Sequence, residues 1–270
     1  MKYKINAVYF SATGTTKKAV KKLAHELAKH FKEETINYKD FTLPSGRKES
    51  LHFAGNDIVI LAVPVYAGRV PNVLLNYLKS VKADGAKAIA MVLYGNRNYD
   101  DALLELTDIL RMNGFNISAA GAFIGEHSFS KILAKDRPDE SDLEKISEFA
   151  KQIYLKISLK TEEEPLIPGN KKYRDYYKPK DKRGDPVDIR KVTPKTNNGC
   201  TDCKLCVSVC PMGSIDYNDV SKLNYICIKC GACIKICPVN AKYYDDENYL
   251  NHKYELEIDF AERKEPVTFL

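Results

Sequence analysis

Short apolar runs alternate with stretches of helical apolar periodicity through about the first 160 residues of the chain. The run from Ile58 to Val63 is apolar at every position. Such a run is typical of a strand that is buried on both faces of a parallel sheet. We expect strands in five runs, which are residues 3–10, a short stretch near Ile36, and residues 57–63, 88–94 and 117–124.

Apolar residues between these runs recur three and four positions apart, which is typical of amphipathic helices. The expected helices cover residues 15–31, 72–80, 103–110 and 143–157. Strands that alternate with helices in this way form a parallel sheet with helices on both faces. The pattern therefore predicts an α/β fold with a five-stranded, doubly wound parallel sheet.

The turn between the first strand and the first helix is rich in hydroxyl groups. Backbone amides at a helix N-terminus bind phosphate without Lys or Arg in the loop, and Gly14 lets the backbone approach an anion closely. The loop matches neither the dinucleotide fingerprint nor the nucleoside triphosphate loop. The alternative is that its Ser and Thr residues only cap the helix. The candidate phosphate contacts are Ser11, Ala12, Thr13, Gly14, Thr15 and Thr16.

Residues 1–157 resemble flavodoxins, whose S/T-x-T-G-x-T loop is matched at Ser11, Thr13, Gly14 and Thr16. The resemblance implies the strand order 2-1-3-4-5. It also implies an FMN at the carboxyl ends of the strands, near the point where the strand order reverses. The loops after the third and fourth strands are then expected to contact the flavin ring.

Those two loops, residues 64–71 and 94–100, are rich in Gly, Asn and Tyr. Such residues suit backbone contacts to a flat polar ring and an aromatic cover over it. Because the chain has no Trp, the aromatic candidates are Tyr66, Tyr94 and Tyr99. The candidate ring contacts are Pro64, Val65, Tyr66, Ala67, Gly68, Tyr94, Gly95, Asn96, Arg97 and Tyr99.

Four residues near this edge of the predicted sheet have two interpretations each. Tyr94 either covers the flavin or is a core residue at the end of a strand. Arg69 and Arg97 either steady a reduced, anionic flavin or lie on the surface. His127, just beyond the fifth strand, is either a proton relay or an ordinary loop histidine.

All eight cysteines lie in the last quarter of the chain, in two runs with the pattern CxxCxxCxxxCP. This spacing is that of segments that bind 4Fe-4S clusters. Four-cysteine zinc sites instead consist of two CxxC pairs separated by a long loop. Disulfide frameworks belong to small secreted domains, and the N-terminus does not resemble a signal peptide. The candidate cluster ligands are Cys200, Cys203, Cys206, Cys210, Cys227, Cys230, Cys233 and Cys237.

Residues 197–246 resemble the bacterial two-cluster ferredoxins, which are small α+β domains. The resemblance implies that the last cysteine of each run ligates the other cluster. One departure is Lys242, at a position after the second CPxxA where an aliphatic residue is common. The implied ligand sets are Cys200, Cys203, Cys206 and Cys237 for the first cluster, and Cys227, Cys230, Cys233 and Cys210 for the second.

The net charge of +6 is concentrated in residues 171–195, which contain ten basic and four acidic residues and three prolines. This composition predicts a linker that crosses a surface. One interpretation is a solvated connector. The other is a positive patch that steers an acidic redox partner toward the protein. Nucleic-acid binding is not indicated, because no recognition motif accompanies the charge.

Several classes of protein are disfavoured by what the sequence lacks. Its longest apolar stretch is too short to span a bilayer. All cysteines are assigned to clusters, so no thiol is left for nucleophilic catalysis, and no Ser-His-Asp or paired-carboxylate arrangement stands out. Oxygen-sensitive clusters without a signal peptide predict a soluble protein of the reducing cytoplasm.

Most of the chain resembles the flavodoxin-ferredoxin fusion proteins found mainly in anaerobic prokaryotes, and only the linker and the tail after Asp246 lie outside this resemblance. VPVYAGRVP at residues 63–71 and YGNRNYDDAL at residues 94–103 support this resemblance. It implies an electron-transfer protein that relays low-potential electrons between FMN, two 4Fe-4S clusters and a redox partner. The alternatives are a flavin-dependent reductase of a small acceptor, such as a quinone or metal ion, and a redox-sensing module. No oligomeric state is indicated.

The expected organisation has four parts. A flavodoxin-like domain is followed by a basic linker, a ferredoxin domain and a C-terminal tail. In the tail, Tyr254, Leu256, Ile258 and Phe260 alternate with polar residues, which suggests an additional strand. The four parts are residues 1–160, 161–196, 197–246 and 247–270.

Overall fold

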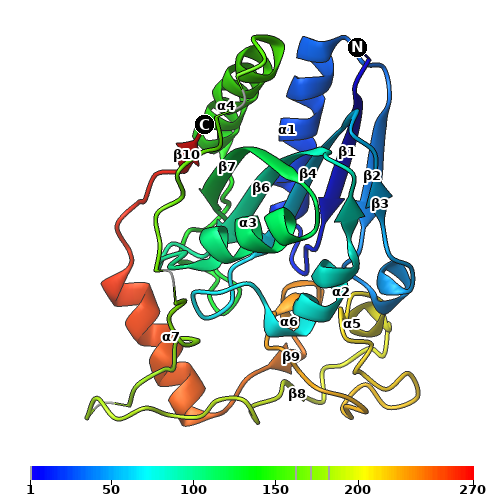
Figure 1. Ribbon diagram of the computed structural model, residues 1–270. Coiled ribbons are helices and arrows are strands. Elements are labelled where there is room, and N and C mark those ends of the chain that lie inside the picture. The colour runs from blue at the N-terminus through cyan, green and yellow to red at the C-terminus, as the bar shows by residue number, and fades with distance from the viewer. Residues whose placement is uncertain (1, 162, 171, 182) are drawn as a thin grey trace.

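The computed structural model of the protein describes residues 2–161, 163–170, 172–181 and 183–270. A six-stranded sheet forms its centre, with the strand order β10-β7-β6-β4-β1-β2 (Figure 1). Five of these strands are parallel, and β10 joins the edge antiparallel to β7. The strands are β1 (Lys4–Tyr9), β2 (Ile36–Asp40), β4 (Asp57–Pro64), β6 (Lys87–Tyr94), β7 (Asn116–Ile124) and β10 (Val267–Phe269).

The five predicted strands and their doubly wound arrangement are confirmed. Counted along the chain, the parallel strands have the order 2-1-3-4-5, which is the flavodoxin-like order. In the middle of the sheet, Ile5 of β1 pairs with Ile36 of β2 on one side and with Ile58 of β4 on the other. The pairing of β6 with β7 has one register shift, between Ala88 and Ile89. The fold therefore places the loops after β1, β4, β6 and β7 at one edge of the sheet.

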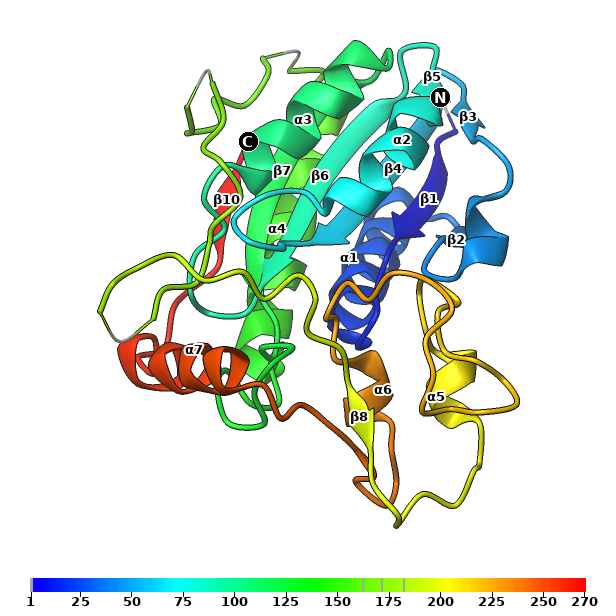
Figure 2. The ribbon, with the colours of Figure 1, turned by 90° about the horizontal axis from the view of Figure 1, so that it is seen from below.

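Helices cover both faces of the sheet (Figures 1 and 2). On one face, α1 and α4 bury residues such as Leu23 and Phe149 against the strands. On the other face, α2 and α3 bury residues such as Leu78 and Leu106. The short helix η2 (Asn72–Leu74) leads into α2. The four helices are α1 (Thr15–Phe31), α2 (Leu75–Ser80), α3 (Ala102–Met112) and α4 (Glu140–Ser158).

A small satellite lies beside the main sheet. The helix η1 (Pro44–Arg47) precedes β3 (His52–Phe53), which pairs in parallel with β5 (Lys82–Ala83). Arg47 donates hydrogen bonds from its guanidinium to the carbonyls of Phe41 (2.9 Å) and Pro211 (2.6 Å). This side chain therefore ties the α/β domain to the cysteine-rich region.

The cysteine-rich region lies below the carboxyl ends of the parallel strands (Figure 1). It contains two helical turns of similar construction, each beginning after a residue with left-handed backbone, Lys204 in one and Gly231 in the other. An antiparallel pair of short strands closes the region. Its elements are β8 (Lys195–Thr196), α5 (Leu205–Ser208), α6 (Ala232–Lys235) and β9 (Lys242–Tyr243).

The basic segment before the cysteines is anchored to the α/β domain, so the solvated connector is the wrong interpretation for its tyrosine-rich part. The Tyr173 hydroxyl donates to Asp108 (2.5 Å), and the Tyr176 hydroxyl donates to the Val70 carbonyl (2.8 Å). The Arg69 guanidinium lies over both of these rings. Aromatic side chains thus hold down a segment that its charge alone would leave in solvent. Residues 171 and 182, which the predicted basic segment includes, lie outside the described residues.

The predicted strand around residues 254–260 is wrong, because these residues belong to the helix α7 (Glu247–Asp259). The Asp246 carboxylate caps this helix by accepting the Tyr249 amide (2.9 Å). Tyr249, His252 and Leu256 are buried at helical spacing, and this burial overrides the alternating pattern. The tail does add a strand, but it is β10, further along the chain.

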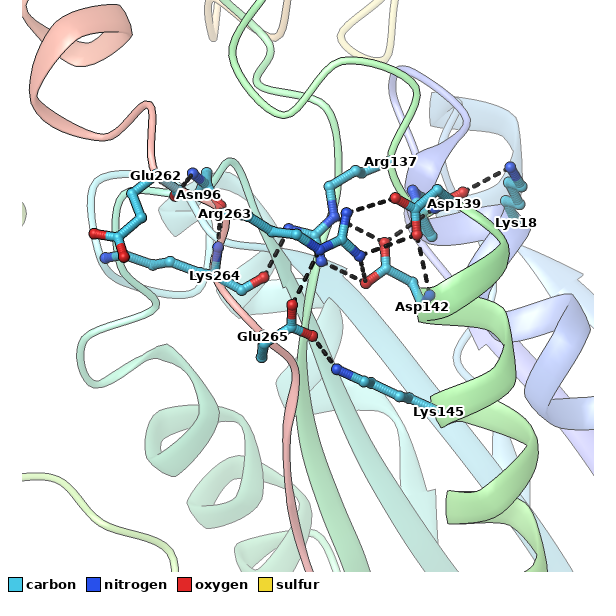
Figure 3. Close-up of polar contacts among 11 residues, drawn as sticks. Lys18, Asn96, Arg137, Asp139, Asp142, Lys145, Glu262, Arg263, Lys264 and Glu265 are labelled. Carbon is cyan, nitrogen blue, oxygen red and sulfur yellow. Dashed lines mark hydrogen bonds and ion pairs between the residues drawn. The ribbon is translucent and has the colours of Figure 1, made fainter.

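Polar contacts hold the segment before β10 against α4 (Figure 3). Arg137 forms a buried ion pair with Asp142 and donates to the Lys264 carbonyl (2.7 Å). Arg263 pairs with Asp139 (2.6 Å), and Glu265 pairs with Lys145. The chain therefore leaves the cysteine-rich region through α7 and returns to the α/β sheet. No helix in the described ranges has the length and apolarity needed to cross a membrane.

Candidate functional site

The hydroxyl-rich loop after β1 lies at the N-terminus of α1, as predicted. Ser11 stabilises this loop through two hydrogen bonds. Its Oγ accepts the Lys17 amide (3.0 Å), and its own amide donates to Thr42 Oγ1 (2.8 Å). Gly14 has a φ of +90°, a backbone conformation that favours glycine. A Cβ atom built at Gly14 would meet nothing within 4 Å, so the loop faces open space at this point.

The charges at this helix start fit an anion. Gly14, the N-cap residue of α1, provides no side-chain cap, Ser11 Oγ accepts the Lys17 amide, and the first turn contains no acidic residue. In the described part of the chain, the amides of residues 13–16 have no protein acceptor. Lys17 and Lys18 add positive charge at the positive end of the helix dipole, where Lys17 lies 3.7 Å from the Asp40 carboxylate and the Lys18 ammonium donates to the Pro138 carbonyl (2.7 Å). The amides and these charges together suit a phosphate group.

A hollow beside this loop contains many of the predicted flavin contacts. It is bounded by the ends of β4 and β6, the loop after β7, and one residue of the cysteine-rich region, Cys230. Its predicted lining residues are Ala12, Thr13, Thr15, Thr16, Pro64, Val65, Tyr66, Tyr94 and Gly95. Tyr94 lines the hollow and also belongs to the core, so its predicted contact with the flavin stays a prediction. Gly14 lies on the adjoining hollow, on the phosphate side of the loop.

The loop after β4 forms a tight hairpin turn next to this hollow. The amides of Tyr66 and Arg69 each donate to the other residue's carbonyl, at 3.0 and 3.1 Å. Ala67 and Gly68, between them, have φ values of 52° and 78°, which suit a two-residue hairpin turn. The Ala67 carbonyl accepts the Tyr177 amide (2.9 Å), so the basic segment covers this turn. Ala67 and Gly68 shape the loop but do not line the hollow.

Three residues predicted to contact the flavin ring have other partners. The buried Asn96 side chain donates to the carbonyls of Phe260 (2.6 Å) and Glu262 (2.8 Å), and thereby holds the C-terminal tail. Arg97 pairs with Asp100 and lies over the Tyr177 ring. Tyr99 packs beside Tyr94, with 5.6 Å between ring centroids. The structure therefore places Asn96, Arg97 and Tyr99 outside the lining of the hollow.

Arg69 has a structural role, and the prediction that it steadies the flavin is not supported by its contacts. Its guanidinium forms two hydrogen bonds to Glu105, at 2.7 and 2.8 Å, and one to the Arg174 carbonyl (2.6 Å). The Glu105 carboxylate also accepts the Val70 amide (2.9 Å). This ion pair locks the loop after β4 against α3.

The loop after β7 contributes residues that the sequence analysis did not assign to the flavin site. Gly125, Glu126, His127 and Ser128 all line the hollow. The His127 Nδ1 atom accepts the Phe129 amide (3.1 Å), which places the ring proton on Nε2. Burial lowers the pKa of His127 to about 3, so the ring is neutral at ordinary pH. The position of this loop after the fifth parallel strand is the signal that would have found it.

The cysteines of the first predicted ligand set face a common space. Cys200, Cys203, Cys206 and Cys237 line one hollow, and Cys203 is exposed. Cys237 belongs to the second sequence run, so its position agrees with crossed ligation. In the described ranges no three His, Cys, Asp or Glu side chains converge on one metal ion. Four thiols around a shared hollow fit a polynuclear cluster.

The second predicted set is more deeply buried. Burial, with smaller contributions from Cys227 and Cys210, raises the pKa of the Cys230 thiol to about 12. Burial and the same neighbours, together with Cys230, also raise the pKa of Cys233. Cys210, from the first run, packs in one apolar cluster with Cys233, Cys206 and Cys200. The assignment of ligands to individual clusters stays a prediction.

Backbone amides surround the fourth cysteine of each run in the same way. The Ser214 amide donates to Cys210 Sγ (3.3 Å), and the Ala241 amide donates to Cys237 Sγ (3.1 Å). The turns that bring these amides to the sulfur atoms contain Gly213 and Asn240, whose φ values are 60° and 51°. Glycine and asparagine both tolerate positive φ, which explains these residue types at the two turns.

The departure at Lys242 places a positive charge next to the first set. Lys242 is almost fully buried and lines the same hollow as Cys200 and Cys237. Its ammonium donates to Thr196 Oγ1 (2.8 Å) and to the Val220 carbonyl. A buried charge is retained only with such partners. It is therefore held in a fixed position beside the predicted cluster.

Comparison with known proteins agrees with the cysteine pattern. Residues 168–252 match the family model of the 4Fe-4S dicluster domain. The match begins within the predicted linker and ends within α7. Among the curated proteins there is no significant match to the chain.

Solved structures similar to the α/β part include flavodoxins. One from Streptococcus pneumoniae TIGR4 is 19% identical, with 56% of this chain and 98% of that chain covered and a TM-score of 0.40. An archaeal flavodoxin is 14% identical, with coverages of 57% and 99% and a TM-score of 0.41. Rubredoxin oxygen:oxidoreductase from Desulfovibrio gigas is 19% identical, with coverages of 58% and 36% and a TM-score of 0.39.

The strand order and the family match define the class of the protein. Its N-terminal part has the flavodoxin-like fold. Its C-terminal part contains a 4Fe-4S dicluster domain with all eight cysteines. The chain thus joins a flavodoxin-like fold and a 4Fe-4S dicluster domain in one polypeptide.

Proposed function

We propose that the protein is an electron carrier that holds one FMN and two 4Fe-4S clusters and relays low-potential electrons between them and a redox partner. The observation that carries this proposal is the position of Cys230. This residue belongs to the predicted second ligand set and also lines the hollow beside the phosphate loop. The flavin site and the second cluster site therefore share a wall.

Different residues of the hollow would bind the phosphate and the ring of FMN. The amides at the start of α1 and the hydroxyls of Thr13 and Thr15 would bind the phosphate. Tyr66 and Tyr94 would exclude water from the ring, and the Nε2 proton of neutral His127 is available as a donor at its edge. Bound FMN would take up one or two electrons, whereas each cluster passes one at a time. FMN and the clusters together would therefore link two-electron transfer to one-electron transfer.

The surface near the first cluster site suits a protein partner. Cys203 is exposed, and so are the apolar side chains of Leu205 and Val239, which line the same hollow. Elsewhere on the surface, Arg183 and Arg190 of the basic segment are highly exposed beside Asp181 and Asp188, and the Arg190 carbonyl accepts Lys229 of the second cysteine run. We propose that a partner with an acidic surface is attracted by this charge, with association that weakens as salt increases.

Reconstitution tests the cofactor content. The protein, purified anaerobically and supplied with iron, sulfide and FMN, is expected to contain about eight irons and one FMN per chain. Iron, sulfide and flavin assays measure this content. A content of about two metal ions without sulfide would contradict the proposal. Sustained turnover of quinones or metal ions would instead favour a reductase, whereas rapid exchange with a ferredoxin or flavodoxin would favour a carrier.

Lys242→Met should lower the reduction potential of the first cluster, because a buried positive charge stabilises the more negative, reduced cluster. We expect a change of roughly 50 to 100 mV, the Coulomb energy of one charge about 8 Å away at an effective dielectric constant of about 20. Anaerobic titration followed by EPR measures the shift. Lys222→Met is the control, because Lys222 is exposed and its charge is screened. Equal potentials in wild type and Lys242→Met would contradict this role.

A further inference from the structure

We propose that the segment Cys230–Lys235 of the dicluster domain completes the flavin site, so that FMN affinity depends on the second cluster being in place. This inference rests on the proposed function. It adds a coupling between the two cofactor sites, because the same short segment contributes to both. Three contacts carry it.

The first contact is Cys230 itself. Its side chain is buried and lines the hollow together with Tyr66 and Thr16. Tyr66 and Cys230 therefore form adjoining parts of the lining of one hollow, although they belong to different domains.

The second contact is between the backbones of the two domains. Gly231 has a φ of +71°, and a Cβ atom at this position would lie only 2.4 Å from the Ser128 carbonyl oxygen. Ser128 belongs to the loop after β7 that lines the hollow. The cysteine-bearing segment thus packs directly on a wall of the flavin site, at a distance that only glycine permits.

The third contact is Lys235, the last residue of α6. Its ammonium pairs with the Glu126 carboxylate and donates to the His127 carbonyl (2.8 Å). Lys235 also lines the hollow that contains Thr13, Gly14 and Lys18, on the phosphate side of the loop. It therefore fixes the loop after β7 and neutralises the Glu126 carboxylate, which lines the same hollow near the predicted phosphate position.

The coupling follows from how this segment is held. The helix α6 is a single turn, and isolated helices of this length are not stable in water. Its predicted support is ligation of Cys230 and Cys233 by the second cluster. When that cluster is absent, Gly231 and Lys235 are no longer held against the loop after β7. Because coupling is reciprocal, bound FMN is expected to stabilise the second cluster as well.

The test compares FMN dissociation constants, measured by fluorescence quenching on the full chain. Cys227→Ala, which removes a ligand of the second cluster, is expected to weaken FMN binding by at least about tenfold. Cys203→Ala, which removes a ligand of the exposed first cluster, is expected to weaken it by less than about threefold. Equal affinity in wild type and Cys227→Ala, with the second cluster shown by EPR to be missing, would overturn the proposal.

Lys235→Met retains all eight cysteines. It therefore tests the same coupling in a variant whose clusters can form, even if Cys227→Ala fails to fold. With about eight irons retained, this variant is expected to bind FMN about 3- to 10-fold more weakly, because it loses an anchor of the hollow and leaves the Glu126 carboxylate unpaired near the phosphate. Lys222→Met, a charge loss at an exposed position of the same domain, is the matched control and should bind as wild type does. Unchanged affinity in Lys235→Met would also overturn the inference. Wild-type protein that binds no FMN would refute the proposed function itself, whereas equal binding with and without clusters would refute only the coupling.

Discussion

Cys210→Ala is expected to lose the second cluster and to keep the first, with about four of about eight irons remaining. Although Cys210 belongs to the first sequence run, crossed ligation makes it a ligand of the second cluster, and it packs in the same apolar cluster as Cys233. The first hollow is lined by Cys237 and not by Cys210. Iron and sulfide analysis, with EPR of the dithionite-reduced protein, measures the outcome.

Cys237→Ala is the matched control, because it exchanges the roles of the two runs. It should lose the cluster held with Cys200, Cys203 and Cys206 and keep the second one. FMN binding adds a separate readout, since only Cys210→Ala is expected to weaken it. A Cys210→Ala protein that keeps the second cluster and loses the first would contradict the crossed assignment.

Arg137→Leu is expected to lower the free energy of unfolding of the α/β domain by about 3 to 5 kcal/mol, the usual consequence of removing one partner of a buried ion pair. Asp142 is completely buried and accepts hydrogen bonds from Arg137 at 2.5 and 2.8 Å. Leucine would leave this carboxylate with weaker compensation, because Arg263 lies 3.6 Å away. The tail would also lose the hydrogen bond at Lys264.

Urea unfolding followed by circular dichroism measures this change. Lys145→Met is the control, because the Lys145–Glu265 pair is roughly half exposed and pairs of that kind contribute less than about 1 kcal/mol. Both variants remove a contact between the tail and the α/β domain (Figure 3). Similar small losses in the two variants would show that the buried pair is not what holds this region.

The α/β fold could be predicted because its signals are local. The apolar run of β4 and the spacing of Val20, Leu23 and Leu27 in α1 each determine an element without reference to distant residues. The cysteine runs could be recognised for a similar reason, because the spacing within each run predicts cluster ligands without reference to distant residues. For the same reason the phosphate loop could be recognised, since a strand, a hydroxyl-rich turn and a helix follow one another directly.

Long-range contacts account for what the sequence did not reveal. Asn96 has the residue type of a ring contact, but its amide binds Phe260 and Glu262, more than 160 positions away. The alternation around Leu256 suggested a strand, whereas burial of one helical face decided the structure. Cys230 has a clear cluster-binding pattern, and nothing in that pattern indicates that it also borders the flavin hollow.

An anaerobic redox titration followed by EPR and visible absorbance tests whether one chain holds FMN and two 4Fe-4S clusters that exchange electrons. We expect two iron-sulfur centres and one flavin in the same chain, all reduced reversibly at low potential. A protein that shows a single iron-sulfur centre, or no flavin that titrates with the clusters, would contradict this expectation.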